Sequence, residues 1–277
     1  MCYLVGRTLN RRMTTDARTG ADAHAEAPDA HRPDASEQQV TDHVIDVALR
    51  EFCRLPFGEA KLENIARGAG MSKRMIHYYF GDKRGLYQMA LAEALRRLQP
   101  EQESMHVDSS IPVEGVARIV DALNQCFLEH SEAVAMVQME NAQRVLNLAE
   151  MPPLVDHTPV ILNLDRLLLI GQDSGAFRPG ISAYDIYYLV VSLLSRRSNT
   201  ELTSMNLYGA DMSSPTNVEG THRMAVDAVL SFLTANISDT GHESYLTLEQ
   251  HTDSDTEEQS APSIYGEEDV SSAIYGG

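Results

Sequence analysis

Tryptophan is absent from this chain of 277 residues, and only 6% of its residues are aromatic. Because β-rich cores draw on aromatic and β-branched side chains, this composition favours a core of packed helices. No apolar run approaches the roughly 18 residues that a membrane-spanning helix needs. The N-terminus places a short apolar patch before its arginines, which is the reverse of the order in a secretory signal. These absences disfavour membrane and secreted classes.

Cysteine is also scarce, with three residues scattered at Cys2, Cys53 and Cys126. An odd, dispersed set fits a reducing compartment better than a disulfide framework, so we expect a cytoplasmic protein.

The sequence has no HExxH or CxxC motif, "GQDSG" is not a nucleophile elbow, and "GAGMSK" lacks the phosphate-loop spacing. We therefore expect no enzyme, no catalytic or metal-binding residues and no cofactor. A reactive dyad in a cavity would be the feature that favours an enzyme instead.

Positive charge is scarce and unevenly placed. The chain has 22 Lys and Arg against 40 Asp and Glu, for a formal net charge of −18. Residues 40–100 hold ten basic and seven acidic residues, whereas residues 101–235 and 236–277 each have a net charge of −10. One net-positive block in an acidic chain indicates that only this block has an anionic partner.

Polar, aperiodic sequence flanks the chain at both ends. We expect residues 1–36 to form a disordered arm, in which Met13 is an alternative translation start, and residues 237–277 to form an acidic disordered tail. The tail repeats "SIYG" and "AIYG", which fits either a docking motif or a merely solvated tail. Between the ends, residues 37–84 and 85–236 are expected to form two helical domains.

The apolar residues between the ends follow helical periods, and no stretch alternates convincingly enough to predict a sheet. The fold class is therefore expected to be all-α. Expected helices cover residues 39–54, a short second segment before Gly70, a third from Ser72 to about Phe80, a fourth after Asp82, and then 112–130, 131–150, 159–171, 182–198 and about 218–236.

The second and third of these helices are spaced as a helix-turn-helix unit. Gly70 supplies a turn that needs a positive φ, Ala66 is small enough for the helices to approach, and Ser72 is a good N-cap. In such a unit the second helix enters the major groove of DNA, with its N-terminal residues at the base edges. The cations at this point are therefore expected to meet phosphates and bases.

Six side chains are expected to contact DNA. Arg74 can form two hydrogen bonds with a guanine edge, and Lys73 can do the same or bind phosphate. Lys83 at the start of the next helix adds an anion site. The expected contact residues are Ser72, Lys73, Arg74, His77, Tyr78 and Lys83.

The stretch "LENIARGAGMSKRMIHYYFGDKRGLY" resembles the N-terminal domain of the tetracycline-repressor (TetR) family of transcriptional regulators over about residues 40–90. The resemblance implies a three-helix DNA-binding domain joined to a helical ligand-binding and dimerisation domain. It also implies a homodimer fastened by residues 182–198 and about 218–236, which reads an inverted-repeat operator and is released by a small molecule. His77 stands where many members have tyrosine, so its contact should weaken as the pH rises.

The resemblance further implies an effector cavity in the second domain. Polar residues within its apolar helices are the candidate ligands, because burying them costs energy unless a partner is present. They are Gln138, Asn141, Asp165, Arg166, Tyr184, Tyr187 and Tyr188, and they favour a small aromatic or hydroxylated effector. An effector-independent DNA-binding protein or activator with an acidic interaction tail stays the alternative to a repressor.

Overall fold

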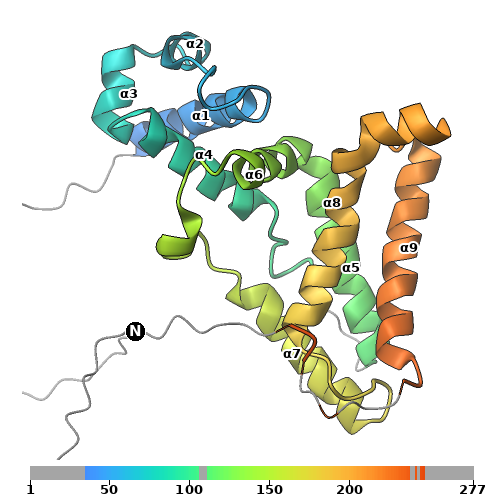
Figure 1. Cartoon of the computed structure of the whole chain (residues 1–277). Coiled ribbons are helices and arrows are strands. Elements are labelled where there is room, and N and C mark those ends of the chain that lie inside the picture. The colour runs from blue at the N-terminus through green and yellow to red at the C-terminus, as the bar shows by residue number, and fades with distance from the viewer. Residues whose placement is uncertain (1–34, 106–110, 238–240, 242–243, 247–277) are drawn as a thin grey trace, which may run out of the picture. The chain divides into compact units, whose positions relative to one another are not determined.

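The computed structural model describes residues 35–105, 111–237, 241 and 244–246, and these contain helices and no strand (Figure 1). Residues 1–34 of the expected arm and the tail repeats lie outside the described residues, whereas residues 35–36 begin α1. The described elements are α1 Ala35–Phe52, α2 Leu62–Gly68, α3 Lys73–Phe80, α4 Lys83–Arg97, α5 Pro112–Glu129, α6 Ser131–Gln143, the 3-10 turn η1 Leu148–Glu150, α7 Thr158–Asp173, α8 Ala183–Tyr208 and α9 Pro215–Thr234. None of these helices is both long and apolar enough to cross a membrane.

The chain divides into one unit up to Asp42 and a second from His43 onward. In the first unit, the start of α1 is supported by local side-chain bonds. Gln38 Nε2 donates to Asp42 Oδ1 at 3.2 Å, and Thr41 Oγ1 donates to the Gln38 carbonyl at 2.8 Å. The first of these bonds joins two side chains four residues apart, a spacing that stabilises an exposed helix face.

In the second unit, α2 and α3 pack through a small apolar centre. Ile65 and Ile76 are fully buried there, and Ala66 is 5% exposed. The backbone turn between the helices is a Schellman motif, since the Met71 amide donates to the Ala66 carbonyl at 2.8 Å and the Gly70 amide to the Arg67 carbonyl at 3.2 Å. Gly70 has a φ of 64°, as the sequence predicted.

A second tight turn separates α3 from α4. Gly81 has φ 74° and ψ −74°, and the Asp82 amide donates to the Phe80 carbonyl at 2.9 Å, which defines a γ-turn that glycine adopts most readily. Asp82 then caps α4 by accepting a bond from the Gly85 amide at 2.8 Å. A β-carbon on Gly85 would lie 2.1 Å from the Phe80 carbonyl oxygen, so glycine is required there.

Helix α4 packs against α6 and so connects the helix-turn-helix to the remaining helices. The buried Tyr87 ring lies edge-on to Phe52 and Phe57, with ring centroids 4.9 and 5.2 Å away. The Phe57 amide donates to Gln143 Oε1 on α6 at 2.9 Å. The loop after α1 is therefore fixed to both α4 and α6.

Helices α5, α7, α8 and α9 build the rest of the core (Figure 1). Their contacts are made by fully buried aliphatic side chains at helical spacing, as expected from their apolar periodicity. They include Ile119, Leu123, Leu164, Ile186, Val190, Val229 and Leu233.

Two helix ends differ from the sequence prediction by more than five residues. Helix α6 was expected to reach residue 150 but ends at Gln143, because Arg144 adopts a left-handed conformation with φ 52° and ψ 49°. Helix α8 was expected to end at 198 but continues to Tyr208. The residues between contain no glycine or proline, and Gly209 then ends the helix at φ 66°.

Residues 244–246 of the expected tail fold back onto the start of α8. Asp185 completes a capping box with Ser182, and its carboxylate also accepts bonds from the Tyr245 amide at 3.1 Å and the Leu246 amide at 2.8 Å. Arg178 donates to the Tyr245 hydroxyl at 3.0 Å. We call this set of contacts the Asp185 clasp. The acidic tail is therefore anchored before residue 247.

Candidate nucleic-acid interface and effector residues

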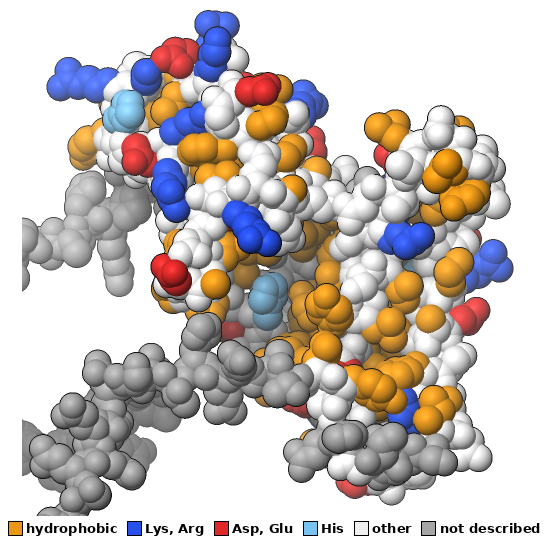
Figure 2. All heavy atoms as spheres, in the orientation of Figure 1, with side chains coloured by type: hydrophobic (Ala, Val, Ile, Leu, Met, Phe, Trp, Pro, Cys, Tyr) orange, Lys and Arg blue, Asp and Glu red, His pale blue; other side chains and the backbone are white. Residues whose placement is uncertain are grey.

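Helix α3 presents its first turn to solvent. Ser72 caps the helix by accepting a bond from the Met75 amide at 3.3 Å, and this fixes the direction of Lys73 and Arg74, which are both exposed. Figure 2 shows Lys and Arg side chains gathered over this part of the molecule. Within the part of the chain that the structure describes, Arg74 makes no hydrogen bond or ion pair. Its guanidinium is therefore available to an external acceptor.

Lys73 is paired with Glu63 on α2, at 2.6 Å between Nζ and Oε1. The hydrogen bond from Lys73 holds the pKa of Glu63 below its ordinary value. Both side chains are about half exposed, so the pair contributes little to stability. A phosphate that approaches Lys73 competes with Glu63 for the same ammonium group.

His77 and Tyr78 lie one turn further along α3. His77 Nδ1 is 2.7 Å from the Gly81 carbonyl, to which it must donate, so the neutral ring keeps only an acceptor at Nε2. Tyr78 is 78% exposed and makes an edge-on ring contact with Tyr79.

Lys83 has a second role that the sequence did not indicate. Its ammonium donates to the Phe57 carbonyl and lies 4.5 Å from the centre of the Phe57 ring. Burial lowers the pKa of Lys83, while the charge of Glu63 opposes that shift. Lys83 therefore ties the loop after α1 to the start of α4.

The structure does not bring the seven expected effector residues together. Asp165 and Arg166 are exposed on α7, and Tyr184 and Tyr188 are 44% and 64% exposed on α8, because the inward faces of both helices are occupied by aliphatic residues. These four positions do not fit a ligand-lining role within one chain. Gln138 and Tyr187 are half-buried, and Asn141 lines a separate cleft at the end of α6.

His157, which the sequence analysis missed, lies beside Tyr187 with ring centroids 5.9 Å apart. Burial lowers the pKa of His157 and raises that of Tyr187, so both are neutral near pH 7. His157 Nδ1 and Gln138 Nε2 are buried without a hydrogen-bond partner among the described residues. No motif surrounds His157, so nothing in the sequence marked it.

Two family models match the chain. Residues 44–90 match the model described as bacterial regulatory proteins of the tetR family, and residues 112–229 match a tetracyclin repressor-like C-terminal domain. The chain belongs to the TetR family. Its members are DNA-binding transcriptional regulators and not enzymes, as the sequence analysis predicted.

Two curated transcriptional repressors are similar to this chain. The HTH-type transcriptional repressor NicS of Pseudomonas putida is 22% identical over 62% of this chain and 82% of its own length. The HTH-type transcriptional repressor SCO4008 of Streptomyces coelicolor is 23% identical over 59% of this chain and 79% of its own. Each alignment is longer than the matched C-terminal domain alone, which covers residues 112–229.

Solved structures of transcriptional regulators share the fold. FadR of Bacillus subtilis, solved with stearoyl-CoA, matches with a TM-score of 0.51 at 16% identity over 69% of this chain and 98% of its own. The putative regulator SCO4942 of Streptomyces coelicolor gives 0.50 at 19% identity over 70% and 98%. The predicted fold class, a helix-turn-helix domain followed by a helical domain, is confirmed.

Proposed function

We propose that this protein is a cytoplasmic repressor that binds an inverted-repeat operator as a homodimer and leaves it when a small organic effector binds. The observation that carries the proposal is the capped, exposed first turn of α3, where Arg74 has no partner in the described residues. The curated relatives named above are repressors, which supports repression and not activation of transcription. Ser72, Lys73, Arg74, His77 and Tyr78 form the DNA-facing set. Lys83 belongs to this set as well, because its ammonium group can donate to the Phe57 carbonyl and to a phosphate at the same time.

Replacing Arg74 with alanine tests whether this side chain makes a base-specific contact with DNA. We expect a loss of about 1–3 kcal/mol on the cognate duplex, with little change on unrelated sequences, because a bidentate contact with guanine is lost. The cognate site is first selected from genomic DNA, and affinities are then measured by fluorescence anisotropy. Arg118→Ala, which removes another exposed arginine, is the matched control. If the affinity fell equally for every duplex, Arg74 would contact the phosphate backbone and not a base.

Dimerisation is assigned to the outer faces of α8 and α9. The exposed apolar and aromatic side chains of α8 include Tyr184 and Tyr188, four residues apart, and Leu202 and Met205, three residues apart, and Met224 is 63% exposed on α9. Exposed apolar side chains at these spacings are typical of a helix that packs against a second helix outside its own chain. A second copy of α8 and α9 would complete a four-helix bundle.

Acidic substitutions on the outer face of α8 and α9 test whether this face forms the dimer interface. We expect the double variant Leu202→Glu and Met224→Glu to run as a monomer of 30.6 kDa in light scattering, while the native chain runs at twice that mass. The free energy needed to bury two carboxylates in an apolar interface is larger than the free energy that the interface gains on dimerisation. Leu162→Glu on the exposed face of α7 is the control and should stay dimeric. If the double variant were still a dimer, the dimer interface would lie on another face of the protein.

The effector is assigned to the C-terminal domain near Gln138, His157 and Tyr187. Buried polar groups are normally hydrogen-bonded, so the unpaired atoms of Gln138 and His157 favour a ligand that supplies the missing partners. The aromatic ring of Tyr187 beside His157 favours an aromatic or hydroxylated molecule. Tyr187 and Gln138 were expected from the sequence, and His157 completes the group.

A further inference from the structure

The helix-turn-helix carries one acidic residue among its cations. Residues 62–81 contain three Lys and Arg residues and a single carboxylate, that of Glu63 in the first turn of α2. The Glu63 side chain lies at the surface and is 57% exposed. A carboxylate on a surface that meets phosphates weakens binding, because like charges repel one another.

Glu63 acts directly on both lysines that are expected to contact DNA. It is joined to Lys73 at the start of α3 by a salt bridge, with 2.6 Å between Lys73 Nζ and Glu63 Oε1. This hydrogen bond is the main cause that holds the pKa of Glu63 below its ordinary value, so the carboxylate is charged near pH 7. Burial lowers the pKa of Lys83, and the negative charge of Glu63 opposes that shift.

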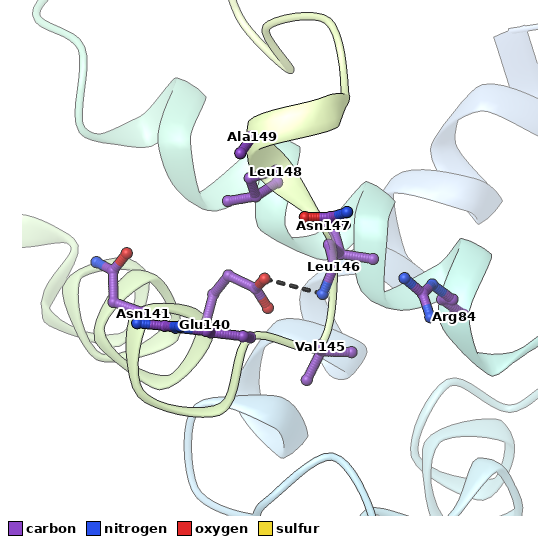
Figure 3. Close-up of a pocket in the computed structure, with 9 residues that line it drawn as sticks. Arg84, Glu140, Asn141, Val145, Leu146, Asn147, Leu148 and Ala149 are labelled. Carbon is purple, nitrogen blue, oxygen red and sulfur yellow. Dashed lines mark hydrogen bonds between the residues drawn. The ribbon is translucent and has the colours of Figure 1, made fainter.

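The neighbouring arginines are placed differently. Arg74 is exposed and makes no hydrogen bond or ion pair with the residues that the structure describes. Arg84, in the first turn of α4, lines a cleft at the end of α6 together with Val145 and Leu146 (Figure 3). Arg74 is therefore free to contact a base, whereas Lys73 meets DNA with a carboxylate already bound to it.

A phosphate that binds Lys73 must come close to Glu63. An ammonium group has three donors, so Lys73 can donate to Glu63 and to a phosphate oxygen at the same time. Two acceptors at hydrogen-bond distance from one ammonium nitrogen lie about 4–5 Å apart. At that separation in water, the repulsion between two negative charges lowers an affinity by about fivefold, and salt weakens the effect. The Glu63 carboxylate therefore opposes any phosphate at Lys73, whatever the base sequence.

We propose that Glu63 limits the DNA affinity of this protein by weakening the contact of α3 with the phosphate backbone to a similar extent on every sequence. This rests on the proposed function, in which α3 faces DNA. An allosteric effector typically changes the affinity at a second site by about 5–150-fold. A complex held less tightly by its backbone contacts is released more completely by a change of that size. Glu63 therefore keeps operator binding within the range that an effector can reverse.

Replacing Glu63 with glutamine in the full-length protein tests this role, because glutamine keeps the shape of the side chain and removes its charge. We expect Glu63→Gln to bind both the selected operator duplex and an unrelated duplex about three to ten times more tightly than the native protein. Lys73 then contributes an uncompensated charge, so the slope of log affinity against log salt should steepen by about 0.9. Fluorescence anisotropy at about 50 to 200 mM salt measures both quantities.

Two further variants show whether the gain comes from Lys73. Adding Lys73→Gln to Glu63→Gln should return the affinity and the salt slope to about the native values, because the charged pair is then removed as a whole. Glu114→Gln changes the net charge equally and also removes an exposed acid from a first helical turn, that of α5. It should bind DNA as the native protein does. Circular dichroism should show similar midpoints of thermal unfolding for Glu63→Gln and Glu114→Gln.

The outcomes separate this role of Glu63 from the proposed function. If Glu63→Gln bound DNA no more tightly than Glu114→Gln, or if its gain persisted after Lys73→Gln, Glu63 would not limit DNA affinity through Lys73. Arg74→Ala, measured in the same assay, tests whether α3 faces DNA at all. A loss of affinity in Arg74→Ala without a gain in Glu63→Gln would overturn only the role of Glu63. If neither variant changed the affinity, the proposed DNA-facing position of α3 would be wrong as well.

Discussion

Replacing Asp185 with alanine is expected to lower the free energy of unfolding by about 3 kcal/mol, since it removes a helix cap and several hydrogen bonds to a charged acceptor. The carboxylate is 6% exposed and accepts bonds from the amides of Ser182, Tyr245 and Leu246. Its loss removes the acceptor that these three amides share and weakens the attachment of residues 244–246 to α8. Urea denaturation followed by circular dichroism measures the change.

Two further variants make this result specific. Asp227→Ala removes an exposed aspartate from α9 and should change stability by less than about 0.5 kcal/mol. Asp185→Asn keeps one acceptor oxygen and should fall between the native protein and Asp185→Ala. An Asp185→Ala protein as stable as Asp227→Ala would show that the clasp contributes nothing.

The Asp185 clasp also gives stability a defined pH dependence. Burial alone would raise the pKa of Asp185, but the N–H groups of Ser182, Tyr245 and Leu246 outweigh burial and hold the pKa below its ordinary value. Because the native pKa is the lower one, the contribution is complete above about pH 4 and is lost as the pH falls through the native pKa. Asp185→Asn should flatten this part of the stability profile.

Gly85→Ala is expected to destabilise the helix-turn-helix by about 3 kcal/mol, at the upper end of the usual cost of overpacking. The new β-carbon would lie 2.1 Å from the Phe80 carbonyl oxygen, which is backbone and cannot rotate away. The turn that orients α3 must then shift, so operator affinity should fall with stability. Thermal unfolding and fluorescence anisotropy measure the two losses.

Gly220→Ala is the control for that substitution. Gly220 is also helical, and a β-carbon there would meet nothing within 4 Å. Alanine has the higher helix propensity, so this variant should be more stable than the native protein by about 0.5–1 kcal/mol. If Gly85→Ala gave the same gain, the close approach of Phe80 to α4 would be wrong.

Local signals allowed the helix-turn-helix to be predicted closely from the sequence. Gly70, Ser72 and Asp82 each determine a turn or cap through their own backbone or side chain, and all three act as predicted. The start of α5 at Pro112 was likewise predicted. Features that depend on neighbouring residues along the chain can be read from one sequence.

Features that leave no such signal in the sequence could not be predicted. The end of α6 at Arg144 carries no glycine or proline signal, because the left-handed turn is stabilised by Glu140 and by burial of Leu146. Tyr184, Tyr187 and Tyr188 look alike in the sequence, yet only Tyr187 faces another helix. Which of them is exposed depends on how α8 packs, which sequence periodicity alone did not establish.

The Asp185 clasp decides where the chain can be shortened. A truncated version that ends near residue 236, where the polar sequence begins, would discard Ser244, Tyr245 and Leu246 and strip the start of α8 of their bonds. Cutting after Leu246 keeps those bonds while removing the acidic remainder. Comparing the two truncated versions therefore separates the charge of the C-terminal extension from the stability of the domain to which it is attached.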